Sequence, residues 1–260
     1  MPAAQSLPIN AFKRGLAAGA PQVGLWLGLD SPNATEIVAG SGFDWLLLDL
    51  EHSTISVSSV VDHLRAASGG TAELMVRIPW NDPVILKRLL DTGVRSFMIP
   101  FVQSAEEASR AVAATRYPPQ GIRGVAGNTR ASNYNRIADY ARRCHEELCV
   151  VVQIEHPTGL AAVEAIAAVD GVDGLFIGPN DLASTMGYLA NPSAPEMKVV
   201  IEEGLARIRR TGKAAGILQF SRPEARALLA AGVNFVAVGS DASILARQSE
   251  ALLADVAPAA

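Results

Sequence analysis

The stretch Phe43-Asp-Trp-Leu-Leu-Leu-Asp-Leu-Glu-His-Ser53 decides the fold class of this chain. Its apolar run from Trp45 to Leu48 is long enough for a strand that is buried on both faces. The run then gives way to Asp49, Glu51 and His52. Because a buried strand offers such groups no partners along its length, we expect them where the strand emerges from a sheet. In α/β barrels that position, at the C-terminal ends of the strands, carries the chemistry.

Two later stretches repeat this design. Val150-Val-Val-Gln-Ile-Glu155 is an apolar run that closes on a carboxylate, and Gly174-Leu-Phe-Ile-Gly-Pro-Asn-Asp181 is another. The C-terminal ends of parallel strands meet at one edge of a sheet. The three stretches therefore predict one convergent site of acids and an imidazole.

The spacing of the apolar runs predicts the architecture. Nearly all of the strand candidates alternate with helical patterns, which favours parallel strands. Eight such strands favour a closed (β/α)₈ TIM barrel, with a doubly wound open sheet as the alternative. No Pro-, Ser- or Gly-rich linker divides the chain, so we expect one domain over residues 1–260. The strand candidates begin at Val23, Phe43, Glu73, Ser96, Leu148, Gly174, Ala214 and Phe235.

Helical periodicity is expected between these strands, including residues 56–67, 137–147, 159–168 and a closing helix at 243–256. One connection is irregular. Residues 117–136 contain Pro-Pro and several glycines and then a polar stretch, and so long a connection in a compact domain is typically a functional loop or lid.

Composition excludes several classes of function. The 260 residues are 49% hydrophobic and 18% charged, with a formal net charge of −4, so no basic stripe favours nucleic acid or a membrane surface. The N-terminus lacks the pattern of a secretion signal, and no apolar run is long enough to cross a membrane. Cys144 and Cys149 are too few for a disulfide framework, which predicts reduced thiols in a soluble, cytoplasmic protein.

Glu155 and Asp181 are the first candidates for chemistry. Both follow apolar runs on consecutive strands, so their carboxylates would lie side by side and repel unless a cation sits between them. Two carboxylates with open positions, and no Cys or His cluster, suit a hard divalent ion such as Mg²⁺ or Mn²⁺. Alternatively each acid pairs with an arginine or caps a helix, and Asp181 could open a helical turn.

Asp49 and His52 form a second candidate pair. A carboxylate three residues from an imidazole can fix its tautomer and raise its basicity, which gives a general base near neutral pH. A lone histidine is more often structural. His63 and His145 fall in helical patterns and are expected on solvated surfaces.

Arg77 and the turn at Gly178-Pro-Asn-Asp181 could bind an anion. Arg77 ends the third strand candidate, where it could pair structurally with Glu51 or Asp49, or hold a substrate carboxylate or a developing enolate oxygen. The backbone amides of the turn could bind a small carboxylate. No G-x-G-x-x-G follows a strand and no Walker lysine is present, so a dinucleotide site is not expected.

The lysines argue against one class of mechanism. Barrel aldolases that form a Schiff base need a lysine at the C-terminal end of a strand. Lys13, Lys87 and Lys198 fall in helical patterns, and Lys213 precedes a strand. A Schiff-base mechanism is therefore not expected.

With these residues in view, the chain resembles the HpcH/HpaI family of class II pyruvate aldolases, within the phosphoenolpyruvate/pyruvate-barrel superfamily. The matching stretches span most of the predicted barrel in the family's order. They are Leu48-Asp-Leu-Glu-His-Ser53, Val76-Arg-Ile-Pro-Trp-Asn-Asp82, Tyr117-Pro-Pro-Gln-Gly-Ile-Arg-Gly124, Val152-Gln-Ile-Glu155 and Phe176-Ile-Gly-Pro-Asn-Asp-Leu182.

The resemblance implies roles for the candidate residues. Glu155 and Asp181 would hold a divalent metal, Mg²⁺ or Mn²⁺ with Co²⁺ or Zn²⁺ as alternatives. His52, oriented by Asp49, would be the base together with a metal-bound water, and Arg77 would stabilise the pyruvate enolate. The remaining contacts to substrate would come from Gln153, which lines the pocket, and from the turn at Gly178, Pro179, Asn180 and Asp181, whose amides receive the pyruvate carboxylate.

The resemblance also implies an activity and an assembly. The expected reaction is the reversible cleavage of a 4-hydroxy-2-oxo acid, similar to 4-hydroxy-2-oxoheptanedioate, to pyruvate and an aldehyde. The alternatives are a 2-dehydro-3-deoxyglucarate aldolase, a CoA-thioester lyase on the same barrel, and a non-catalytic module that binds keto acids. A homo-hexamer is implied, with the C-terminal helix exchanged between neighbouring chains. His156 follows Glu155 where a small polar residue is expected, and either a contact behind the site or a loop position would suit it.

Overall fold

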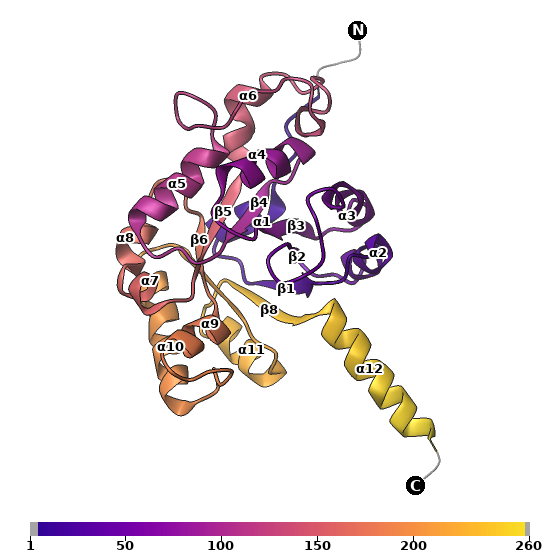
Figure 1. Cartoon of the computed structure of the whole chain (residues 1–260), viewed down its shortest axis with the longest axis vertical. Coiled ribbons are helices and arrows are strands. Elements are labelled where there is room, and N and C mark those ends of the chain that lie inside the picture. The colour runs from indigo at the N-terminus through magenta and orange to yellow at the C-terminus, as the bar shows by residue number, and fades with distance from the viewer. Residues whose placement is uncertain (1–4, 258–260) are drawn as a thin grey trace.

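The computed structural model describes residues 5–257, and its strands close into a parallel eight-stranded barrel surrounded by helices (Figure 1). The strands pair in chain order, and the last pairs with the first. The predicted (β/α)₈ barrel is confirmed, and the open-sheet alternative is wrong. The strands are β1 Gln22–Leu27, β2 Trp45–Asp49, β3 Glu73–Arg77, β4 Ser96–Ile99, β5 Cys149–Ile154, β6 Gly174–Ile177, β7 Ala214–Leu218 and β8 Phe235–Ser240.

The helices alternate with the strands, with extra short helices before β5 and after β5 and β6. No helix of residues 5–257 is long and apolar enough to cross a membrane. The α-helices are α1 Ala11–Ala17, α2 Pro32–Ala39, α3 Val60–Ala67, α4 Pro83–Thr92, α5 Ala105–Thr115, α6 Tyr140–Arg143, α7 Pro157–Ala161, α8 Val163–Ala167, α9 Pro179–Thr185, α10 Pro195–Arg210, α11 Arg222–Ala230 and α12 Asp241–Val256, and the 3₁₀-helices are η1 Arg130–Ser132 and η2 Cys144–Glu147.

Three predicted helices have different bounds. The helix expected at 56–67 begins at Val60, because the serines before it hydrogen-bond to one another in turns. The helix expected at 137–147 is reduced to α6 and η2, since Asp139 adopts a left-handed backbone with φ of 53°. The helix expected at 159–168 is broken at Ala162 into α7 and α8.

The barrel interior is filled by large side chains, so it is a packed core and not a channel. Trp45 and Phe235 are fully buried there, and Phe176 is almost so. Gly24 makes room for this layer, because a Cβ there would overlap the indole of Trp45. At the N-terminal end, α1 closes the barrel with Phe12, whose ring lies 5.6 Å from that of Trp45 and 5.5 Å from that of Phe235.

The C-terminal helix α12 leaves the barrel and extends away from it (Figure 1). Only its first turn is anchored: the Asp241 carboxylate accepts hydrogen bonds from the amides of Gly28 and Leu29 at 2.8 and 3.1 Å. Along the rest of the helix, apolar side chains are exposed, among them Ile244, Leu245, Leu252 and Leu253. The two cysteines, Cys144 and Cys149, are buried and unpaired, as predicted.

Candidate active site

Asp49 and Arg77 meet at the C-terminal ends of β2 and β3, where the strand register places them side by side. Arg77 donates from Nε to Oδ1 at 2.9 Å and from Nη2 to Oδ2 at 2.6 Å. Burial alone would raise the pKa of Asp49, but Arg77 and the backbone amides of Glu51 and His52 together hold it below its usual value. The pair is therefore a charge-assisted, bidentate link that is removed from solvent.

The same guanidinium also faces Glu51 and Trp26. Arg77 Nη1 lies 2.9 Å from Glu51 Oε2, although the atoms are not aligned for a hydrogen bond. Its Cζ lies 5.4 Å from the centre of the Trp26 ring. Arg77 therefore makes the structural pairing with Asp49 and Glu51 that the sequence offered as one possibility. Its positive charge lies at the end of the barrel where the acids are.

His52 lies beside this network with most of its imidazole exposed. Its Nε2 is 3.9 Å from Glu51 Oε2, and its side chain is 64% exposed. Asp49 contacts His52 through the backbone amide, which donates to Oδ1 at 3.3 Å, and not through the ring. The expectation that Asp49 orients the imidazole directly is corrected, because Arg77 and two amides already occupy that carboxylate.

Glu155 follows β5 directly and is almost completely buried, with 1% of its surface exposed. Its Oε1 accepts a hydrogen bond from the amide of Phe101 at 2.9 Å, whereas its buried Oε2 has no partner among the described residues. Burial, together with the nearby carboxylates of Glu51 and Asp181, raises the pKa of Glu155 to about 8. A carboxylate in this setting binds either a proton or a cation.

Asp181 faces the same space from the first turn of α9, so the helical alternative is confirmed for its backbone. It is half-buried, and its charge raises the pKa of both Glu51 and Glu155. No group of three or more His, Cys, Asp or Glu side chains within residues 5–257 could hold a metal alone. Glu155 and Asp181 are two oxygen donors, so a cation held by them would need further ligands from water or substrate.

Gln153 and Gly178 complete the floor around Glu155. Gln153 points inward from β5, and its buried Oε1 lacks a partner among the described residues. The amide of Gly178 donates to the carbonyl of Ile154, so it is not available to a ligand. The turn contributes Pro179, which has no N–H, and the amide of Asn180 at the start of α9.

The comparison with known proteins assigns the family. The model of the family described as HpcH/HpaI aldolase/citrate lyase matches residues 22–247. The chain belongs to this family. A 4-hydroxy-2-oxo-heptane-1,7-dioate aldolase of Salmonella paratyphi C is 50% identical over 246 residues, 94% of this chain and 94% of that protein. A protein of the same name from Escherichia coli is 49% identical over the same shares.

Solved structures of HpcH/HpaI proteins agree with this assignment. A family member from Burkholderia cenocepacia J2315 has a TM-score of 0.91 at 37% identity and covers 95% of this chain and 99% of its own. Another, from Desulfitobacterium hafniense DCB-2, has a TM-score of 0.88 at 28% identity, over 95% and 97%. The predicted resemblance is confirmed, and with it an enzyme of the aldolase kind.

The remaining histidines of this HpcH/HpaI chain are structural or peripheral. His156 caps α7, because its Nδ1 accepts from the amide of Thr158 at 3.2 Å. His63, expected on a solvated surface, is fully buried and contacts Thr35 Oγ1 at 2.7 Å and Asp30 Oδ1 at 3.1 Å, so that expectation is wrong. His145 lies exposed in η2.

None of the described barrel strands ends in a lysine, as predicted. Lys13 and Lys213 donate to the carbonyls of Leu148 and Val172, which lie next to the starts of β5 and β6. Lys198 pairs with Glu224 across α10 and α11 at 2.9 Å, and Lys87 lies on α4. This placement argues against an imine mechanism at the C-terminal face.

Two contributors to the site were not found by reading the sequence. The amide of Phe101 fixes one oxygen of Glu155, and Phe101 adopts a left-handed backbone with φ of 51°. Trp26 packs against Arg77 from β1. A backbone amide has no side-chain signature, and an aromatic residue in an apolar run looks like any other core residue.

Proposed function

We propose that the chain is a divalent-metal-dependent class II aldolase that reversibly cleaves 4-hydroxy-2-oxo acids to pyruvate and an aldehyde, with 4-hydroxy-2-oxoheptanedioate as the substrate class. One observation supports the metal: Glu155 Oε2 is buried beside two further carboxylates and has no hydrogen-bond partner among residues 5–257. The names of the relatives at about half identity support the reaction.

Glu155 and Asp181 would hold the ion, and Mg²⁺ or Mn²⁺ suits two oxygen donors with open positions. A bound ion of this kind supplies a Lewis acid that polarises the keto group of the substrate. The Phe101 amide holds Oε1 of Glu155, which leaves Oε2 turned into the site. This arrangement keeps the glutamate from swinging back into the apolar wall.

The other residues act on the organic substrate. His52 removes the proton from the 4-hydroxyl as the C3–C4 bond breaks, and returns it in the synthetic direction. Its exposed imidazole is open to the aldehyde side. Arg77, locked by Asp49, places a fixed positive charge where the enolate oxygen develops. Gln153 and the amide of Asn180 would receive the pyruvate carboxylate.

Chelation tests the metal. Treatment with EDTA should remove cleavage activity, and Mn²⁺ or Mg²⁺ should restore it. Glu155→Gln should lose the ion and the activity while the fold is retained. Full activity after exhaustive chelation would refute the proposal. Borohydride added with pyruvate should leave the enzyme active, because no barrel strand within residues 5–257 ends in a lysine.

Proton exchange separates the alternatives. An aldolase should exchange the methyl protons of pyruvate into D₂O only when the ion is present, and the exchange is followed by NMR. A non-catalytic keto-acid module would bind pyruvate without exchange. A CoA-thioester lyase would need CoA for turnover. A panel of aldehydes, including the acceptor for 2-dehydro-3-deoxyglucarate, identifies the preferred substrate.

We also propose a cytoplasmic homo-hexamer in which α12 packs on a neighbouring chain. The observation in support is the set of exposed apolar side chains on α12, a helix that extends away from the barrel (Figure 1). A helix with this much exposed apolar surface is typical of an interface. Sedimentation of the full chain and of Leu252→Asp tests it, since the variant should dissociate. An unchanged sedimentation coefficient of the variant would count against packing through α12.

A further inference from the structure

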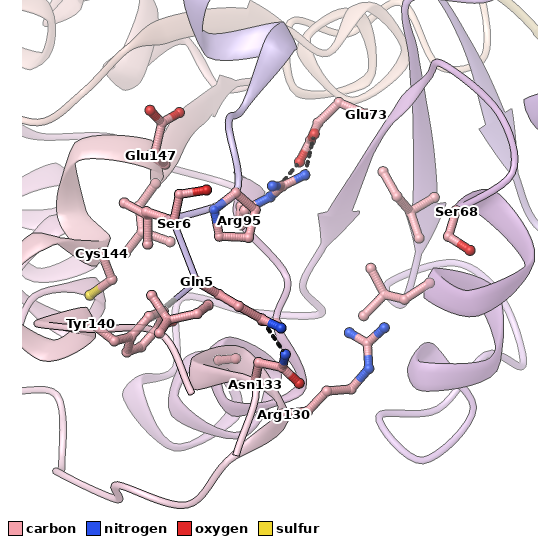
Figure 2. A pocket seen from close by; sticks show the side chains of 18 of the residues that line it. Gln5, Ser6, Ser68, Glu73, Arg95, Arg130, Asn133, Tyr140, Cys144 and Glu147 are labelled. Carbon is pink, nitrogen blue, oxygen red and sulfur yellow. Dashed lines mark hydrogen bonds and ion pairs between the residues drawn. The ribbon is translucent and has the colours of Figure 1, made fainter. Parts of the chain in front are cut away.

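A cavity lies at the end of the barrel opposite the candidate active site, at the N-terminal ends of β3, β4 and β5 (Figure 2). We call it the basal cavity. Its volume is about 570 Å³. Its walls are the segment Gln5 to Pro8, the end of α3, and the excursion from η1 to η2 that precedes β5. The irregular connection predicted to be functional thus forms one wall of this cavity.

The acids in this wall already have partners. Glu73 receives two hydrogen bonds from Arg95, at 2.7 and 3.3 Å, and both lie in the cavity wall (Figure 2). Glu147 is paired with Arg14 and accepts from the amide of Asn10 at 2.6 Å. Neither carboxylate is therefore available to neutralise another cation in the cavity.

Two other arginines, Arg130 and Arg65, also line the cavity. Arg130 is half-buried, and its Nη1 donates a hydrogen bond to the carbonyl of Thr92 at 2.7 Å. No carboxylate of residues 5–257 pairs with it. Burial, followed by the charge of Arg65, lowers the pKa of Arg130. Within the described part of the chain, the ion pair of Arg65 is with Asp62, in an exposed i,i+3 contact of little strength. Two like charges are thus held near each other without a shared counter-ion.

The rest of the wall combines apolar side chains with uncharged polar ones such as Gln5, Ser68 and Asn133. Leu64, Ala67, Leu74 and Leu148 line the cavity beside the arginines. Figure 2 shows the guanidinium of Arg130 turned into the open space of the cavity. A cavity of this size is large for an inorganic ion and falls in the range of small-molecule sites, which combine an apolar lining with a few polar groups.

We propose that the basal cavity binds a small organic anion, a carboxylate or a phosphate ester with an apolar body, and that Arg130 and Arg65 hold its charged end. The apolar body lies against Leu64 and Leu148. This site is separate from the acids at the C-terminal face, because Glu73 and Arg77 mark opposite ends of the same strand.

Titration calorimetry with benzoate, phenyl phosphate and inorganic phosphate tests the proposal on the full chain. The first two should bind, and the preference between them identifies the anionic group. Inorganic phosphate should bind more weakly, since it has no apolar body. Arg65→Gln should weaken binding by about tenfold, the loss expected for one charged hydrogen bond. Arg130→Lys, which retains the charge, should bind better than Arg130→Gln.

The control is Arg110→Gln. Arg110 makes a similar exposed i,i+3 contact, with Glu107 on α5, and does not line the cavity. The Arg110→Gln variant should bind the organic probes as tightly as the wild type does. Hydrogen exchange should show ligand protection in residues 5–8 and 130–137. If neither organic probe binds at millimolar concentration, or if Arg65→Gln and Arg110→Gln bind them equally, the site does not exist.

Discussion

Gly178 lies against Glu155 so closely that a Cβ on Gly178 would overlap the Oε2 atom of that carboxylate. The same Cβ would lie 2.9 Å from Gln153 Nε2. The backbone of Gly178, with φ of −88° and ψ of 96°, is open to any residue, so the requirement for glycine is steric. The end of β6 thus fixes the shape of the space around the buried acid of β5.

Gly178→Ala should therefore damage the site and leave the barrel folded. The added methyl group must push Glu155 or Gln153 aside, at a cost of about 1–3 kcal/mol for overpacking. We expect weaker metal binding and a fall in kcat/KM. Gly28→Ala is the matched control at the same face, because its Cβ would meet nothing closer than 3.8 Å. Equal metal affinity in both variants would show that Glu155 tolerates displacement.

Arg77→Lys should lower the rate more than the stability. Lysine keeps the charge but not the fork that binds both oxygens of Asp49, and losing a fixed transition-state charge typically costs ~10²–10³ in kcat. Arg95→Lys is a control of the same geometry, since Arg95 binds Glu73 with two hydrogen bonds at the opposite end of β3. It should lose stability and retain kcat. Unchanged kcat in Arg77→Lys would leave Arg77 with a structural role only.

The barrel was predictable because the residues of each strand are enough to indicate that strand. Each strand is a short apolar run. The polar residues at or just after the ends of β2, β3 and β5 mark the C-terminal end of the barrel. The direction of α12 was not predictable, because an apolar helical pattern does not say which surface it packs against. The break before α6 depends on the left-handed backbone of Asp139, which nothing in its neighbours signals.

Within the site, spacing along the chain could not decide between two partners for Asp49. His52 is close in sequence, but Arg77 is its neighbour across the β2–β3 pair, and the register resolves the competition in favour of Arg77. The Phe101 amide was hidden for a similar reason. Its hydrogen bond to Glu155 depends on the backbone after β4, not on a side chain.

The stability of the metal-free protein should fall as the pH rises. The pKa of Glu155 is about 8 in the folded chain against an ordinary 4.5, so the folded state holds a proton that the unfolded chain has released. This contribution is complete below pH 4.5 and is lost as the pH rises through about 8. Urea midpoints across this window measure it.

Two comparisons isolate Glu155 in that experiment. Glu155→Gln should remove most of this slope, because an amide can still accept from Phe101 and carries no charge. Added Mn²⁺ should flatten the slope in the wild type by replacing the proton. Parallel curves for the wild type and Glu155→Gln would mean that another group titrates.

His52→Ala should abolish cleavage and leave stability within about 0.5 kcal/mol of the wild type, because an exposed side chain contributes little to the fold. His156→Ala is a control in which the effects on stability and activity should be reversed. It removes the cap of α7, which should cost about 1 kcal/mol, and should leave kcat intact. Thermal unfolding and steady-state cleavage are measured on the same samples. Near-normal turnover in His52→Ala would show that another group is the base. Glu51 would then be the candidate, because its carboxylate lies beside the imidazole of His52.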